Sequence, residues 1–146
     1  MTAVDTNLLV YAHRGDSGWH ESTKQCVRDL SEGALPWAIP WPCIHEFLAI
    51  VTSPRIFRKP TPLADALDQV EAWMESPTLH LVGEGPDHWK RLRSTLEAGN
   101  IAGAKVHDAR IHTICTDQGA SVLWSADRDF NRFQGLRVTN PLVGKT

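Results

Sequence analysis

The sequence has few cysteines and no long apolar run, so it offers little for disulfide bonds, a structural zinc site or a membrane span. The 146 residues include three cysteines, Cys26, Cys43 and Cys115, which are far apart and form no Cys-x-x-Cys pair. No apolar stretch approaches the roughly 18 residues that span a bilayer, and no basic segment leads into an apolar run at the N-terminus. We therefore expect a protein of the reducing cytoplasm that does not enter a membrane.

The chain also lacks an excess of charge of either sign. Its 15 Lys and Arg residues stand against 17 Asp and Glu residues, which gives a formal net charge of −2. Bulk positive charge therefore cannot hold a polyanion. Any nucleic-acid partner must be bound by local basic groups or by bridging cations.

Linkers and repeats are missing as well. No internal repeat, low-complexity tract or segment rich in Gly, Ser or Pro divides the chain. At this length roughly two thirds of the unfolded surface is typically buried, which is enough for a core without disulfides or metal. We therefore expect one domain over residues 1–146.

What the sequence does contain is a regular alternation of strand-like and helical patterns. Short apolar runs predict strands at residues 2–4, 37–39, 79–82, 121–124 and 136–139. Between them, apolar periodicity predicts helices that begin near Leu8, His20, Pro42, Leu63, Asp87 and Val106. This order is typical of right-handed crossovers, and it predicts an α/β fold with a mainly parallel sheet of about five strands, covered on both faces.

Acidic residues stand where strands of such a sheet end. Asp5 follows the first strand, and Asp127 and Asp129 follow the fourth. Ligands of parallel α/β sheets gather at the carboxyl ends of the strands. Each aspartate could instead be a turn residue or a helix N-cap, a role that Thr6 and Ser125 can also fill.

Two further acids interrupt apolar helices. Glu46 lies within the apolar run 43–51, and Asp108 opens the run 108–115. A buried carboxylate needs a partner, because desolvation otherwise raises its pKa until it is protonated. One interpretation is a structural ion pair with Arg110 or Arg128.

The other interpretation is a site for a hard cation. Acids from separate elements that meet at one end of the sheet suit Mg²⁺ or Mn²⁺, which prefer oxygen ligands, and Mg²⁺ keeps several waters when bound. The cation would also reverse the local negative charge, so that a phosphodiester could approach. Metal-assisted hydrolysis of a phosphodiester is the chemistry that this arrangement favours.

Four segments match a known family in order and spacing. They are Val4-Asp5-Thr6-Asn7 with the apolar residues up to Tyr11, the helix with His45-Glu46-Phe47, the segment Val106-His107-Asp108-Ala109, and residues 125–130. With the chain end at 133–142, they resemble the PIN-domain ribonucleases, and within that family the VapC-type toxins of bacterial toxin–antitoxin modules. The resemblance covers nearly the whole chain.

The resemblance implies a three-layer α/β/α fold and a Mg²⁺- or Mn²⁺-dependent endoribonuclease that cuts RNA such as tRNA or rRNA. It also implies a homodimer and neutralisation by a cognate VapB-like antitoxin. By position, the catalytic acids would be Asp5, Glu46, Asp108 and Asp127, of which Asp5, Asp108 and Asp127 would bind metal, Asp127 directly or through water. Supporting residues would be Thr6, Asn7, Ser125 and Asp129, with Ser125 standing where many relatives have threonine.

Substrate binding must come from cationic groups outside the acids. The loop at residues 53–60 carries Arg55, Arg58 and Lys59, which we predict to contact RNA phosphates. A later helix offers a second group, Lys90, Arg91 and Arg93, and either group could be a merely solvated face. Trp19, Trp37 and Trp41 could stack on bases, although core packing is the commoner role of tryptophan.

Other functions stay open. A Mg²⁺-dependent α/β phosphatase or receiver-like domain also places aspartates at strand ends, but Thr6 stands where its second acid is expected, and no lysine follows the fifth strand. A catalytically inert domain that binds only RNA or a partner protein is a further alternative, although the acids are intact. A metal-independent ribonuclease using His107 and His112 is conceivable, but their spacing does not favour it.

Overall fold

The structure is a computed structural model of the chain, and it describes residues 1–127 and 133–143. Its strands form one five-stranded sheet in the order β3-β2-β1-β4-β5, and every neighbouring pair is parallel. The predicted α/β fold with a parallel sheet is confirmed. The strands are β1 (Thr2–Val4), β2 (Trp37–Pro40), β3 (Leu79–Val82), β4 (Val122–Trp124) and β5 (Arg137–Thr139).

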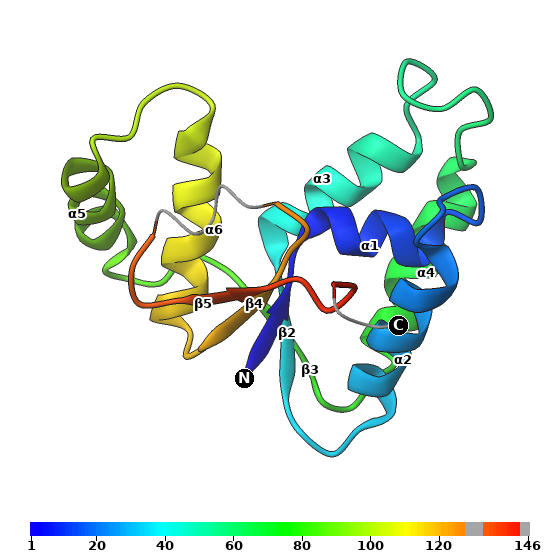
Figure 1. Cartoon of the computed structure of the whole chain (residues 1–146), viewed down its shortest axis with the longest axis horizontal. Coiled ribbons are helices and arrows are strands. Elements are labelled where there is room, and N and C mark those ends of the chain that lie inside the picture. Colours follow the sequence, from blue (N-terminus) through cyan, green and yellow to red (C-terminus); the bar gives the residue numbers. More distant parts are fainter. Residues whose placement is uncertain (128–132, 144–146) are drawn as a thin grey trace.

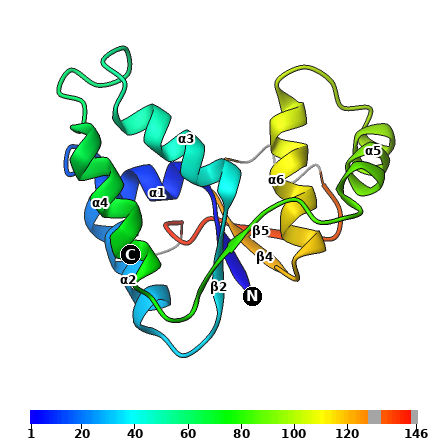
Figure 2. The same cartoon turned by 180° about the vertical axis from the view of Figure 1, so that it is seen from behind.

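Helices cover both faces of this sheet, as predicted. In Figures 1 and 2, α5 and α6 lie on one side of the strands, and α1 to α4 lie on the other. The helices are α1 (Thr6–His13), α2 (His20–Glu32), α3 (Trp41–Val51), α4 (Leu63–Met74), α5 (His88–Gly99) and α6 (Lys105–Asp117). None of the helices in the described part of the chain is long and apolar enough to cross a bilayer.

The strand order reverses at β1, which lies in the middle of the sheet. The chain moves outward from β1 through β2 to β3, and later returns to place β4 on the other side of β1. Such a reversal leaves a crevice at the carboxyl ends of the strands, where α/β proteins bind ligands. Val4 pairs with Trp124, so the residues that follow β1 and β4 emerge side by side.

The core lies around β1 and β2. Ala3, Val4 and Trp37 are fully buried, because central parallel strands have helices on both faces. The Trp37 indole Nε1 donates to Ser76 Oγ at 3.1 Å. Core packing is therefore the role of Trp37, whereas Trp19 and Trp41 keep 53% and 40% of their surface exposed.

Candidate functional site

Asp5 lies at the end of β1 and is the N-cap of α1. Its Oδ1 accepts a hydrogen bond from the Thr6 amide at 2.8 Å, and its Oδ2 accepts one from Ser125 Oγ at 2.7 Å. The Cys43 thiol on α3 lies 3.6 Å from Oδ1 as a further donor. Only 5% of Asp5 is exposed. The carboxylate of Asp5 can therefore cap α1 and also belong to a functional site.

Burial changes the protonation of Asp5. Desolvation raises the pKa of its carboxyl to about 6, against the lowering effect of the hydrogen bond from Ser125. The negative charge of Glu46 raises the pKa further. A cation beside Asp5 would stabilise the charged form that the protein alone disfavours.

Ser125 joins the end of β4 to the start of α1. Its hydroxyl donates to Asp5 and accepts from the Asp127 amide at 2.9 Å. Asn7 supports the same turn, because its Nδ2 lies 3.5 Å from Ser125 Oγ and its Oδ1 accepts from the Ala126 amide at 3.2 Å. The structure thus places Ser125 against Asp5, and Asn7 against Ser125.

Glu46 and Asp108 are less buried than their apolar neighbours in sequence suggested. Glu46 is exposed on α3, and Thr6 Oγ1 donates to its Oε2 at 3.2 Å. Asp108 is half-buried on α6, with Lys105 Nζ 3.9 Å from its Oδ2. The proposed ion pair with Arg110 is wrong, because Arg110 pairs with Glu84. Arg128 lies outside the described residues.

Four of the predicted acids line one pocket. They come from the start of α1, from α3, from α6 and from the turn after β4. Burial raises the pKa of Asp108, and the negative charge of Asp127 raises it further, so the acids repel one another. Asp129, also predicted to belong here, lies outside the described residues. The lining residues are Asp5, Thr6, Asn7, Glu46, Ile50, Asp108, Ile111 and Asp127.

The donor set of this pocket suits a hydrated hard cation. Its charged ligands are carboxylate oxygens, which Mg²⁺ and Mn²⁺ prefer, and neither imidazole nor thiol lines it. Within residues 1–127 and 133–143, no three His, Cys, Asp or Glu side chains stand close enough to form a ready-made metal cluster. A cation here would therefore be held by one or two carboxylates and by water, which is how proteins commonly bind Mg²⁺.

Sequence analysis missed the Cys43 thiol. It is fully buried and lies beside Asp5, one helical turn before Glu46. Positions three apart share one helix face, so this spacing was the available signal. Burial raises the pKa of the thiol well above its usual value, which keeps it a neutral donor to Asp5.

The predicted cationic groups differ in their partners. Arg55, Arg58 and Lys59 are exposed in the loop after α3, and no carboxylate of the described residues forms an ion pair with them. On α5, by contrast, Arg91 pairs with Asp117 at 2.9 Å and Arg93 with Glu97 at 2.7 Å. The loop is therefore the better candidate for phosphate contacts.

The histidine-based alternative gains no support from the geometry. His112 is buried on α6, where its Nε2 lies 2.8 Å from the Gln134 carbonyl oxygen. His107 is exposed on the same helix. Neither residue lines the acidic pocket.

Comparison with known proteins identifies the family of the chain. The family model described as PIN domain matches residues 2–136. The chain is 34% identical over 146 residues to ribonuclease VapC43 of Mycobacterium tuberculosis, covering 100% of this chain and 99% of that protein. It is 33% identical over 143 residues to ribonuclease VapC25 of the same species, covering 98% and 100%.

Solved structures share the fold at lower identity. VapBC2 from Rickettsia felis, bound to a promoter DNA fragment, has a TM-score of 0.66 at 18% identity and covers 94% of this chain and 96% of that one. VapC20 of Mycobacterium tuberculosis, described as a sarcin-ricin loop cleaving toxin, has a TM-score of 0.66 at 15% identity, with coverage of 94% and 99%. Because the family model spans most of the chain and the relatives match it over nearly its whole length, the chain belongs to the PIN-domain family and, within it, to the VapC ribonucleases.

Proposed function

We propose that this protein is a divalent-metal-dependent endoribonuclease that acts as the toxin of a toxin–antitoxin module. The observation that carries the proposal is the pocket in which Asp5, Glu46, Asp108 and Asp127 meet, in a chain of the VapC ribonuclease family. The reaction is hydrolysis of an RNA phosphodiester bond by water. Among the residues that the structure describes, no serine, cysteine or lysine lines the pocket. Direct attack by water requires no covalent intermediate on the protein.

Asp5 and Asp108 are the residues that would hold Mg²⁺ or Mn²⁺, with Asp127 binding directly or through water. When bound, the cation supplies charge stabilisation to the transition state and lowers the pKa of water. Ser125 and the Thr6 amide hold the two oxygens of Asp5, so the carboxylate presents a fixed geometry.

Glu46 has a different position from the other acids. It is exposed at the pocket, and the Thr6 hydroxyl holds its Oε2. We assign it the acceptance of a proton from the attacking water, because it is the pocket carboxylate that we do not assign to the metal ion. Its place on α3 also puts it on the helix that leads into the cationic loop.

Binding partners follow from the same proposal. The substrate is RNA, and the exposed cations Arg55, Arg58 and Lys59 contact its phosphates. The related solved structures include VapBC assemblies from Rickettsia felis and Salmonella typhimurium, which supports a VapB-like antitoxin as the protein partner here. The homodimer and the cytoplasmic location stay predictions.

The proposal is tested by incubating the purified protein with total bacterial RNA in Mn²⁺, in Mg²⁺ or in EDTA, and by mapping new 5′ ends. Discrete cuts are expected with metal only, and Asp5→Asn should abolish them. The matched control is Asp68→Asn, which removes an exposed carboxylate on α4 and should cut like the wild type.

Four outcomes would contradict the proposal. Cleavage that persists in EDTA and in Asp5→Asn would show that the acids are not the site, and a 2′,3′-cyclic phosphate product would favour histidine chemistry. A covalent aspartyl-phosphate without RNA cleavage would indicate the phosphatase or receiver-like class. RNA binding that ignores EDTA and yields no cuts would indicate a catalytically inert binding domain.

A further inference from the structure

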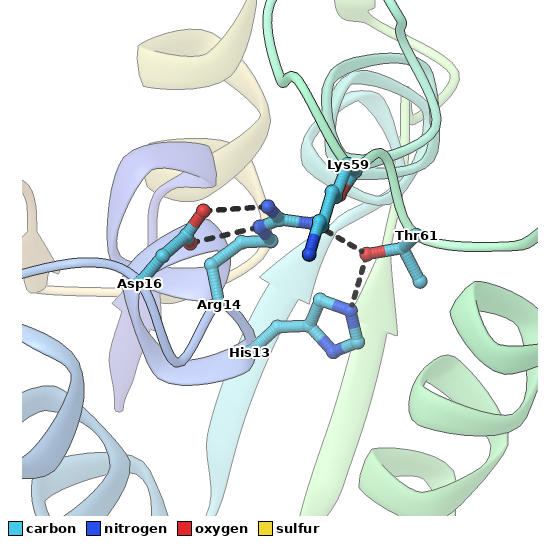
Figure 3. Close-up of polar contacts among 5 residues, drawn as sticks. All are labelled: His13, Arg14, Asp16, Lys59 and Thr61. Carbon is cyan, nitrogen blue, oxygen red and sulfur yellow. Dashed lines mark hydrogen bonds and ion pairs between the residues drawn. The ribbon is translucent and has the colours of Figure 1, made fainter.

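The cationic loop is attached to the end of α1 by a polar network (Figure 3). Arg14 follows the last residue of α1, and its amide donates to the Val10 carbonyl at 2.8 Å, so its side chain starts from a fixed helix end. Beside it, His13 Nε2 lies 3.0 Å from Thr61 Oγ1, and His13 Nδ1 lies 3.1 Å from Gln69 Oε1. The last residue of α1 and the residue after it therefore both reach the chain segment that follows α3.

Each nitrogen of the Arg14 guanidinium donates a hydrogen bond. Its Nη1 donates to the Lys59 carbonyl at 2.8 Å and to Thr61 Oγ1 at 3.3 Å. Its carbon lies 4.0 Å from the centre of the Phe57 ring. On the other side, Nε and Nη2 donate to the two carboxylate oxygens of Asp16 at 3.0 and 2.6 Å. The planar guanidinium of arginine can stack on an aromatic ring and donate hydrogen bonds in several directions at once. The ammonium group of lysine cannot do this.

Asp16 offsets the charge of Arg14. The hydrogen bond from Arg14 lowers the pKa of the Asp16 carboxyl, so Asp16 stays ionised at neutral pH. The Arg14 side chain is only 11% exposed. Arg14 thus holds the loop in position. The exposed positive charges of the loop are those of Arg55, Arg58 and Lys59.

Other contacts hold this loop at its two ends. Its base is closed by the Thr61 amide, which donates to the Val51 carbonyl at 2.7 Å, and its start by a turn in which the Ile56 and Phe57 amides donate to the Ser53 carbonyl. Within that turn Ile56 is 58% exposed, whereas Phe57 packs against the edge of the core. Arg14 contacts Phe57, Lys59 and Thr61, and so ties the second half of the loop to the end of α1.

Helix α1 connects this network with the acidic pocket. It begins at Thr6, which lines the pocket, and its eight residues rise about 12 Å to Arg14. Helix α3 packs beside α1, carries Glu46 at the pocket, and ends where the loop starts (Figure 1). A polyanion with one phosphate in the pocket can therefore extend along α1 toward the loop that carries the cations.

We propose that Arg14 is a positioning residue for RNA: through Phe57, Lys59 and Thr61 it holds the loop so that the cations of Arg55, Arg58 and Lys59 face the phosphates of an RNA bound at the acidic pocket. This inference rests on the proposed function. It predicts that Arg14 affects substrate binding without contacting the reacting atoms.

Steady-state kinetics on a short RNA that contains the mapped cut site test the proposal. Arg14→Gln should raise KM about tenfold and leave kcat within about twofold, because binding is lost equally in the ground and transition states. Arg14→Lys should also raise KM, although it keeps the charge, and it guards against a folding defect. Arg28→Gln removes an exposed arginine of α2 and should change neither constant. A fall in kcat with unchanged KM would overturn the proposal.

A double-mutant cycle separates positioning from direct contact. The background variant replaces Arg55, Arg58 and Lys59 by glutamine. If Arg14 acts through the loop, Arg14→Gln should change KM less than about twofold in this background. If the two effects multiply, Arg14 acts on RNA by itself and the proposal is wrong.

Limited proteolysis gives a reading that does not depend on activity. Trypsin can cut the loop after Arg55 and after Arg58, and both bonds should be cut about tenfold faster in folded Arg14→Gln and Arg14→Lys than in the wild type, since an unheld loop opens more often. Arg28→Gln should match the wild type. If the wild type cuts no RNA, the proposed function fails, while these rates still report on the loop. Equal rates in all variants would overturn the role of Arg14.

Discussion

At the scale of single residues, the metal-free protein destabilises the ionised form of Asp5. Burial raises its pKa from 3.8 to about 6. The folded state therefore binds the Asp5 proton more tightly than the unfolded state does, and the stability that this proton confers is complete below pH 4 and is lost as pH rises through about 6. The difference between the two pKa values corresponds to about 3 kcal/mol of lost stability at pH 7.

Asp5→Asn should therefore stabilise the metal-free protein at neutral pH. We expect the free energy of unfolding in EDTA to rise by about 1–2 kcal/mol at pH 7.5, less than the full electrostatic gain because an amide nitrogen cannot accept the hydrogen bonds that a carboxylate accepts. At pH 4 the gain should vanish. Urea unfolding at both pH values measures this, with Asp68→Asn as the control. A loss of stability at pH 7.5 would make Asp5 a structural ion-pair member.

The sequence identified the residues of the site but not their environments. Asp5, Asp108 and Asp127 were found from their places after strands or at a helix start, which are local features. The burial of Asp5 comes from Cys43 on α3 and from Ser125 after β4, which are distant in sequence. Glu46 was misjudged because its neighbours in sequence are apolar, whereas the helical turn directs Phe47 inward and Glu46 to solvent.

At the scale of elements, the central strands β1 and β2 were predictable because buried parallel strands are short apolar runs between turns. The edge strands β3 and β5 are less buried, but each still carries apolar residues between helical segments. The order of the strands in the sheet was not predictable. Only the placement of β4 beside β1 brings Ser125 to Asp5, and this pairing depends on packing between strands more than 100 residues apart, for which a single sequence has no local signal. Right-handed crossovers restrict the possible orders without selecting one.

Helix α3 shows how an element positions the site. Phe47 is fully buried on it, packing edge-on against Trp73 of α4 at 4.9 Å and against His13 of α1 at 5.3 Å between ring centres. Phe47→Ala should lower the free energy of unfolding by about 3–5 kcal/mol, because it opens a cavity where three helices meet. Trp89→Ala, at a residue that is 69% exposed, should cost less than about 0.5 kcal/mol. Urea unfolding checks both, and equal losses would show that α3 is not anchored by this ring.

At the scale of the whole molecule, an acidic pocket lies at the start of helix α1, and the end of the same helix contacts a cationic loop. The net charge of −2 provides no general attraction for RNA, so affinity must come from this local separation of charge. In the proposed function, the loop cations would hold the chain of phosphates, and the acids would act on one phosphodiester in the pocket. The separation also keeps the cations from neutralising the carboxylates that would hold a metal ion.

Because of this arrangement, the salt dependence of RNA binding measures how many phosphate contacts the loop makes. Each phosphate contact to a single strand contributes about −0.7 to the slope of log K against log salt, so three contacts contribute about −2. In the non-cleaving Asp5→Asn background, replacing Arg55, Arg58 and Lys59 by glutamine should weaken binding and make the slope shallower by about 2.

The matched variant replaces Lys90, Arg91 and Arg93, which removes the same charge from α5, where Arg91 and Arg93 are already paired with carboxylates. It should change the slope by less than about 0.5. If both triple variants change the slope equally, RNA binding follows net charge alone, and the loop has no specific part in it. If only the loop variant changes the slope, the local cations determine where RNA binds, and the overall charge of the protein does not.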